Sequence, residues 1–148
     1  MTDGGYKELK IWSAGKELVK AVYAKLRTFP VEERYALCDQ LRRAVVSIPS
    51  NIAEGYGRDT HKDFAHYLSL ARGSLFEVAT QIEIAIDLRY MERDEKLDEQ
   101  INELSRMIAA FRTRLLTTDT PSPRSTLRTP HSALCTKSPH SALRTPHS

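Results

Sequence analysis

The sequence predicts an all-α protein, an antiparallel up-down four-helix bundle followed by a disordered C-terminal tail. Apolar residues recur at steps of three and four in four successive segments, which is the period of an amphipathic helix. No segment shows sustained alternation of apolar and polar residues, so strands are not expected. Short breaks separate the four segments, and short connections are typical of bundles whose neighbouring helices are antiparallel.

The first helical segment covers residues 11–29. The dipeptide Phe29-Pro30 ends it, because the residue before a proline avoids helical geometry. Its apolar stripe consists of Ile11, Gly15, Leu18, Val22, Leu26 and Phe29, with Trp12, Val19 and Tyr23 alongside.

The second segment covers about residues 31–56 and contains Pro49. Its stripe runs through the proline without losing register, whereas a loop between two helices would reset the phase. We therefore expect one helix that is kinked at Pro49, where the missing N–H frees a carbonyl one turn earlier. The alternative is a true break with a new helix start after the proline. The stripe consists of Cys38, Leu41, Val45, Ile48 and Ile52.

The polar and glycine residues around Pro49 complete this interpretation. Side chains of Ser47, Ser50 or Asn51 are expected to satisfy the freed carbonyl or to bind water, and in the alternative Ser50 or Asn51 is the new N-cap. Gly55 and Gly57 are expected to end the helix.

The third segment begins at a capping box, Thr60 to Asp63, and shows two apolar faces. The core stripe steps by four and three through Phe64, Leu68, Ala71, Leu75, Val78, Ile82 and Ala85. Opposite this stripe lie Leu70, Ile84 and Leu88, with Gly73 beside them. A second apolar face predicts an oligomer interface, although single exposed leucines are also common on monomers. The fourth segment repeats the pattern through Leu97, Ile101, Leu104, Ile108, Phe111 and Leu115.

The composition changes after Leu116, which divides the chain into a bundle domain, 1–118, and a tail, 119–148. The tail holds five of the seven prolines and repeats the motif PHSAL, so we expect it to be disordered. Residues 1–118 hold 18 basic and 18 acidic residues, and the net charge of +3 belongs to the tail. A basic overall charge therefore gives no argument that the bundle binds nucleic acid.

Several kinds of chemistry are excluded on spacing. A di-iron bundle needs paired Glu-x-x-His motifs, and the nearest relative is a single Asp63 to His66 pair. Arg58 does not precede His61 or His66 by the four to six residues typical of bundle-type ribonucleases. Cys38 occupies a core position, where a buried inert thiol is the default. We expect no enzyme, no catalytic residues, no metal and no cofactor. The lack of an apolar run long enough for a leader or a membrane span predicts a cytoplasmic protein.

A cluster of cations near the junction of the second and third segments is the remaining candidate site. Two of its members lie near a helix N-terminus, which favours anions. Acidic residues are interleaved, so the cluster is either an anion or RNA site or an ordinary solvated surface with local ion pairs. The cluster consists of Arg42, Arg43, Arg58, Lys62 and Arg72, and Arg72 is alternatively a structural partner of Glu83.

The run LRRAVVSIPSNIAEGYGR and the following DFAHYLSLARGSLFEVATQIEIA closely resemble the four-helix bundle family found within intervening sequences of bacterial 23S rRNA genes. The matching positions are Arg42, Arg43, Ala44, Val46–Gly55, Phe64, Gly73, Ser74, Leu75, Glu77 and Gln81. The resemblance covers about residues 6–115 and leaves out the tail. It implies a four-helix bundle that assembles as a ring-like homopentamer, without enzymatic activity.

The sequence is similar also to the accessory protein of diversity-generating retroelements, a five-fold barrel that binds a reverse transcriptase and nucleic acid. Two functions therefore stay open. One is an oligomeric adaptor that binds RNA or a ribonucleoprotein, with the chain itself, RNA or a nucleic-acid-processing protein as partners. The other is a structural or protein-interaction scaffold that does not contact nucleic acid.

Overall fold

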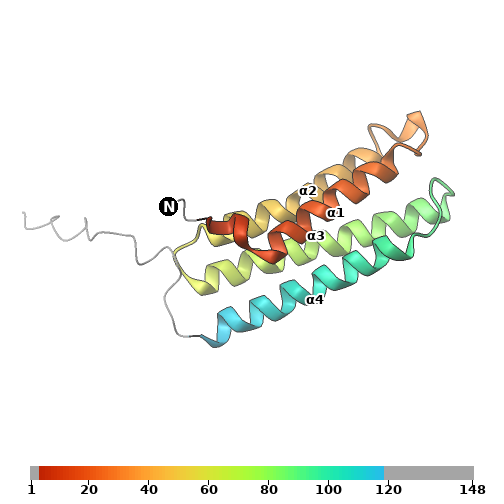
Figure 1. The fold of residues 1–148 in the computed structure, drawn as a ribbon. Coiled ribbons are helices and arrows are strands. Elements are labelled where there is room, and N and C mark those ends of the chain that lie inside the picture. The colour runs from red at the N-terminus through yellow and green to blue at the C-terminus, as the bar shows by residue number, and fades with distance from the viewer. Residues whose placement is uncertain (1–3, 119–148) are drawn as a thin grey trace, which may run out of the picture.

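The computed structural model describes residues 4–118, which form four long helices (Figure 1). A 3-10 helix, η1 (Gly5–Glu8), precedes α1, and a second, η2 (Val31–Glu33), lies between α1 and α2. The described residues contain no strand, so the predicted all-α class is confirmed. The tail predicted for residues 119–148 lies outside the described residues. The four helices are α1 (Lys10–Leu26), α2 (Leu37–Tyr56), α3 (His61–Asp87) and α4 (Glu95–Thr117).

Each helix packs against two neighbours, in the cyclic order α1, α2, α3, α4. The backbones of α1 and α2, α2 and α3, α3 and α4, and α4 and α1 approach each other closely, whereas those of the diagonal pairs lie further apart. Consecutive helices run in opposite directions along the bundle, so the described chain begins and ends at the same end (Figure 1). No helix in residues 4–118 combines the length and hydropathy that a membrane span requires.

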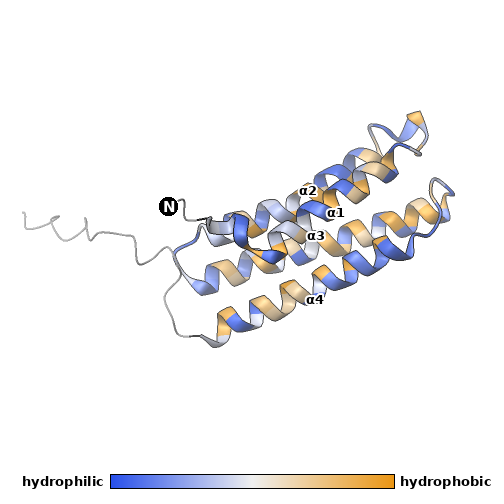
Figure 2. Cartoon of the chain, in the orientation of Figure 1, coloured by the Kyte–Doolittle hydropathy of each residue, from blue (hydrophilic) through white to orange (hydrophobic). Residues whose placement is uncertain are grey.

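The core consists of the four apolar stripes that the sequence predicts. All of their members are buried except Phe111, which is half-buried and packs against the core. Hydrophobic and hydrophilic residues alternate along every helix, as amphipathic helices around a common core require (Figure 2). Met91, in the turn before α4, is also buried, although it belongs to none of the stripes.

An aromatic cluster closes the end of the bundle where the described chain begins. Tyr56 at the end of α2 contacts Tyr6 of η1 and Phe64 of α3 edge-to-face. Phe64 in turn contacts Phe111 of α4, with ring centroids 5.4 Å apart. These contacts tie η1, α2, α3 and α4 together in the favoured geometry of aromatic pairs.

The second helix begins later than the sequence predicts but is otherwise continuous. It starts at Leu37 rather than near residue 31, because η2 and a turn occupy the intervening residues. Pro49 lies inside α2 and is buried, so the alternative of a break after the proline is wrong. Whether the helix bends at Pro49 stays a prediction.

The polar residues around Pro49 bond to carbonyls other than the one that the proline frees, that of Val45. Ser47 Oγ donates to the Ala44 carbonyl, Ser50 Oγ to Val46 and Asn51 Nδ2 to Ser47, at 2.7–2.9 Å. These are the back-bonds that short polar side chains make to a preceding helical turn. The expectation that they satisfy the freed carbonyl is therefore not met.

Gly55 lies within α2 and has a steric role, although the sequence suggests that it ends the helix. A Cβ atom at this position would lie 2.7 Å from Phe64 Cδ2 and 2.7 Å from Tyr67 Cβ. Gly57 is the C-cap residue and keeps right-handed backbone geometry, with φ −73°. The missing side chain of Gly55 thus allows the last turn of α2 to approach α3 closely.

Both later helices begin at a side-chain cap. Thr60 Oγ1 accepts a hydrogen bond from the Asp63 N–H at 3.1 Å, which confirms the predicted start of α3. Asp94 Oδ1 accepts from the Lys96 and Leu97 N–H groups and caps α4 in the same way. Each cap satisfies backbone donors that have no partner inside the helix.

Candidate functional site

The five cations predicted as a site lie on different parts of the molecule. Arg42 is near the start of α2, whereas Arg58 follows its end, 16 residues later, or about 24 Å at 1.5 Å per residue. Arg72 lies further along α3, on the side that faces α4. The set therefore divides into Arg42 and Arg43 near the start of α2, Arg58 and Lys62 around the α2–α3 turn, and Arg72 alone.

Two of these arginines are neutralised by carboxylates one turn away. Arg43 pairs with Asp39 at 3.0 Å, and Arg58 pairs with Glu54 at 3.1 Å. Arg58 also donates to the Tyr67 hydroxyl, and its guanidinium lies 4.5 Å from the centroid of that ring. Exposed pairs at this spacing add little stability, but they lower the positive potential of the corner.

Lys62 and Arg72 make different contacts. Lys62 is exposed at the start of α3 and forms no ion pair with the residues described here. Arg72 Nε donates to Ser105 Oγ of α4 at 3.4 Å, and the guanidinium lies 5.3 Å from the Phe76 ring centroid. Arg72 therefore bridges α3 and α4 on the surface.

The prediction that Arg72 pairs with Glu83 is wrong, because Glu83 has another partner. Arg93 binds Glu83 with two hydrogen bonds of 2.9 and 2.7 Å, and it reaches Asp98 at 3.1 Å. The bidentate contact with Arg93 holds the pKa of Glu83 below its ordinary value. These three residues connect the end of α3 to the start of α4, which is a structural role.

The second apolar face of α3 is exposed in the single chain. Leu70, Ile84 and Leu88 remain 43–51% exposed, and an added Cβ at Gly73 would meet no atom within 4 Å. Their spacing places them on one side of the helix over about 27 Å. Glu77 lies on the same side, where its carboxylate accepts a hydrogen bond from Gln81. We call Leu70, Gly73, Ile84 and Leu88 the outer row.

Gln81 is a polar residue of α3 whose position the periodicity does not explain. Its side chain is buried, and Nε2 donates to Glu77 and to Gln40 of α2. Oε1 is buried without a hydrogen-bond partner among the described residues. An unsatisfied buried oxygen is costly, so this junction of α2 and α3 is a place where a further donor would be stabilising.

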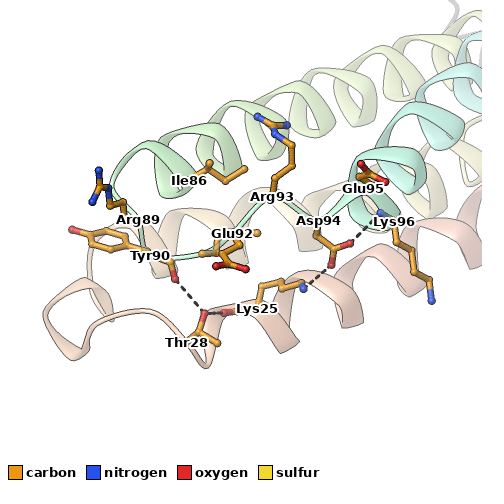
Figure 3. A pocket seen from close by; sticks show the side chains of 11 residues that line it. Lys25, Thr28, Ile86, Arg89, Tyr90, Glu92, Arg93, Asp94, Glu95 and Lys96 are labelled. Carbon is orange, nitrogen blue, oxygen red and sulfur yellow. Dashed lines mark hydrogen bonds and ion pairs between the residues drawn. The ribbon is translucent and has the colours of Figure 1, made fainter.

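A pocket of about 970 Å³ lies between the end of α1 and the α3–α4 turn (Figure 3). Lys25 points to Asp94, and the Nζ–Oδ2 distance is 2.6 Å. Thr28 Oγ1 donates to the Tyr90 carbonyl at 3.3 Å. Because Lys25 and the N-cap carboxylate of α4 neutralise each other, we interpret this pocket as a structural junction between two turns.

Two arginines outside the predicted cluster lie near Arg42. Arg27, Arg34 and Arg42 line one pocket of about 420 Å³ between the end of α1, η2 and the start of α2. Sequence reasoning missed Arg27 and Arg34, but a signal was present. Neither has an acidic residue three or four positions away, so neither has a local ion-pair partner.

The thiol of Cys38 also lines this pocket. Burial is the main cause that raises the pKa of Cys38, while nearby Arg42 and Arg34 oppose it and Glu33 adds to it. A buried thiol with a raised pKa is a poor nucleophile, in agreement with the predicted inert core role. In residues 4–118, no three side chains of the metal-binding types gather into a site.

Comparison with known proteins bears on the origin of this bundle. A search of curated proteins finds no match to the chain. The model of the 23S rRNA-intervening sequence protein family matches residues 7–110, which include all of α1, α2 and α3 and most of α4. With the four-helix architecture and a match over more than half of its length, the chain belongs to the 23S rRNA-intervening sequence protein family.

Proposed function

We propose that this protein works by binding and not by catalysis, as a homo-oligomeric adaptor whose assembly binds RNA or a ribonucleoprotein. The observation that carries the assembly is the outer row of α3, because a single chain leaves three large apolar side chains exposed along one helix face. The family name connects such chains with ribosomal RNA genes, which supports RNA as the partner.

A ring requires two different faces on each chain, and a second apolar surface lies between α1 and α2. This groove of about 410 Å³ is lined by Trp12, Val19, Val46 and Pro49, with Lys16 at its edge. In the proposed ring, the outer row of one copy occupies the α1–α2 groove of the next. Glu77, on the same side of α3 as the outer row, and Lys16, which lines the groove, have complementary charge. We propose five copies, as the resemblance implies.

The assembly is tested by adding charge to the outer row. Replacing Leu70→Glu and Ile84→Glu is expected to convert the oligomer to monomers, because apolar contact area is lost and carboxylates would be buried unpaired. Light scattering coupled to size exclusion gives the mass, and circular dichroism verifies that helicity is kept. Leu116→Glu is the control, because it adds a charge at an exposed apolar residue outside both proposed faces, and Val46→Glu adds a charge inside the groove.

Three results are informative here. A monomeric wild-type protein at micromolar concentration overturns the assembly. An oligomer that survives L70E/I84E shows that the outer row is not the interface. Dissociation by the α3 pair and by V46E alone, but not by L116E alone, supports the outer row and groove as the two halves of one interface.

RNA binding is tested on the same purified proteins. The wild-type oligomer is expected to bind single-stranded RNA with little sequence preference and with steep salt dependence. A specific observation favours the scaffold alternative: Arg43 and Arg58 already pair with carboxylates. If the oligomer binds no RNA at low salt and none co-purifies, the protein is a scaffold without nucleic-acid contact.

A further inference from the structure

The pocket between the end of α1, η2 and the start of α2 differs from other charged surfaces of the protein. Three guanidinium groups, those of Arg27, Arg34 and Arg42, line it together with Tyr23 and Val31. No acidic residue is among its lining residues. We call it the arginine pocket.

These arginines are not neutralised by carboxylates. The ion pairs formed within residues 4–118 use Arg43, Arg58 and Arg93 among the arginines, and none involves Arg27, Arg34 or Arg42. The one side-chain hydrogen bond of this group joins Arg42 Nη1 to the backbone carbonyl of Arg34 at 3.3 Å. A carbonyl acceptor positions the guanidinium of Arg42 beside residue 34 but leaves its charge uncompensated.

Glu33, which precedes Arg34 in the chain, already has two hydrogen-bond donors. Glu33 Oε2 accepts from the Leu37 N–H at 3.2 Å, and Glu33 Oε1 accepts from the Tyr90 hydroxyl at 3.0 Å. Both contacts hold the carboxylate at the junction with the α3–α4 turn. The Glu33 charge still acts on Cys38, but the three arginines outnumber it and none of them forms an ion pair with it, so the pocket favours an anion.

We propose that the arginine pocket binds a phosphate group, and that in RNA this is a backbone phosphodiester whose neighbouring base stacks on Tyr23. Guanidinium forks match phosphate oxygens with paired hydrogen bonds. The volume of about 420 Å³ lies in the roughly 300–1,000 Å³ range of ligand pockets. Tyr23 lines the pocket and is 42% exposed, and exposed aromatic rings beside cations are the usual platform for unpaired bases.

This inference names the binding site for the proposed adaptor function, and it moves that site away from the α2–α3 corner. Only Arg42 belongs to both sets. Arg43 and Arg58 of the predicted cluster have carboxylate partners, whereas the cations of the arginine pocket have none. Binding should therefore depend on the pocket end of the bundle.

The test compares two full-length variants that each lose three positive charges. The pocket variant carries R27Q, R34Q and R42Q. The matched control, the corner variant, carries R58Q and K62Q at the α2–α3 corner and R43Q in α2. Fluorescence anisotropy with a labelled single-stranded RNA oligonucleotide measures the affinity at salt concentrations between about 50 and 300 mM. Over this range, affinity that depends on phosphate contacts changes steeply with salt. Calorimetry with a nucleoside monophosphate and with inorganic phosphate tests whether the pocket also binds a phosphate group that is not part of RNA.

We expect the pocket variant to bind RNA at least about tenfold more weakly, since a single charge-assisted hydrogen bond contributes roughly that factor. The slope of log K against log salt should fall by roughly 0.7, because each neutralised phosphate of a single strand contributes about that much and the pocket binds one. The corner variant should change affinity far less. Because Arg42 is half-buried, the exposed pair R27Q/R34Q is measured as well, with circular dichroism on every variant.

The outcomes separate this inference from the proposed function. RNA binding that survives in the pocket variant but is lost in the corner variant overturns the arginine pocket and leaves the adaptor intact. If both variants lose RNA affinity equally, RNA binds through the overall positive charge and not through a defined site, and the arginine pocket is overturned as well. Binding of monophosphate or inorganic phosphate that requires the pocket, without any RNA binding, supports the phosphate site and overturns the RNA adaptor. No binding of any of the three probes overturns both.

Discussion

Gly55 lies where the last turn of α2 meets the side chains of Phe64 and Tyr67 on α3. Replacing Gly55→Ala is expected to destabilise the fold by about 1–3 kcal/mol, because the new methyl group would lie 2.7 Å from atoms of both residues and force the helices apart. Thermal unfolding followed by circular dichroism measures the effect.

Gly73→Ala is the matched control for this prediction. It lies in α3, and its added Cβ would meet no atom within 4 Å, so the helix should gain roughly 0.5–1 kcal/mol from reduced backbone freedom. Because Gly73 belongs to the outer row, the mass of the control is measured alongside. A Gly55→Ala protein as stable as the wild type would show that the helix ends adjust without cost.

Individual contacts were the part of the molecule that sequence patterns predicted least well. The pair of Arg72 with Glu83 followed from helical spacing, yet Arg93 occupies Glu83 from the turn beyond the helix end. The direction that the chain takes after Asp87 decides this, and Arg89 there has a positive φ of 61°. By contrast, the Thr60 cap depends on residues three positions apart, so the local sequence predicted it.

At the scale of the elements, Asp94 links the start of α4 to the end of α1. The contact with Lys25, and then the Leu97 N–H, hold the pKa of Asp94 below its ordinary value of about 3.8. A carboxyl whose pKa is lowered on folding stabilises the fold above its ordinary pKa, and that contribution is lost as the pH falls through the lowered value. The melting temperature should therefore decrease on acidification below about pH 4, and Asp94→Asn should remove part of this decrease.

Asp87→Asn is the control for the pH dependence, because Asp87 is exposed at the end of α3 and forms no ion pair with the residues that the structure describes. Melting curves at a series of pH values are compared for the wild type and both variants. Raised salt should reduce the difference, since the Lys25–Asp94 pair is partly exposed. If Asp94→Asn and the wild type lose stability in parallel from pH 5 to pH 3, the Asp94 carboxylate does not contribute to the pH dependence of stability.

The start of α2 shows why one element boundary could not be predicted. Val31, Tyr35 and Cys38 are spaced like a helical stripe, but Val31 is 73% and Tyr35 87% exposed. The chain instead forms η2, and Glu33 binds both the Leu37 N–H and the Tyr90 hydroxyl. Tyr90 is 57 residues further along the chain. A long-range contact of this kind leaves no periodic signal, whereas the stripes themselves do.

At the scale of the whole molecule, the boundary of the folded domain stays a prediction. Residues 1–118 are expected to fold on their own, because the predicted stripes and the core they form all lie within this range. A shortened chain of residues 1–118 should keep the melting temperature of the full chain to within a few degrees. Limited proteolysis of the full chain should leave a fragment that ends near residues 112–120. A marked loss of stability on shortening, or protection at Arg128 or Lys137, would contradict this boundary.

The arrangement of four helices was predictable because each stripe allows only one buried face. The grouping of surface charges was not, because it depends on how the turns orient the helix ends. Arg27 and Arg34 lie on either side of η2 and meet Arg42 only through the geometry of that turn. The sequence placed the candidate site at the α2–α3 corner, at the opposite end of α2.

Because the number of antiparallel helices is even, both ends of the described chain lie at the same end of the bundle. This determines where another protein can be attached. Residues 4 and 118 both lie at the end that holds the aromatic cluster, and Thr118 lies next to His61 at the start of α3. Along α3, with its 27 residues, the opposite end is about 40 Å away. A label or reporter fused before residue 4 or directly after residue 118 would therefore start far from the arginine pocket. Surface immobilisation through either junction should leave that pocket open to a dissolved ligand.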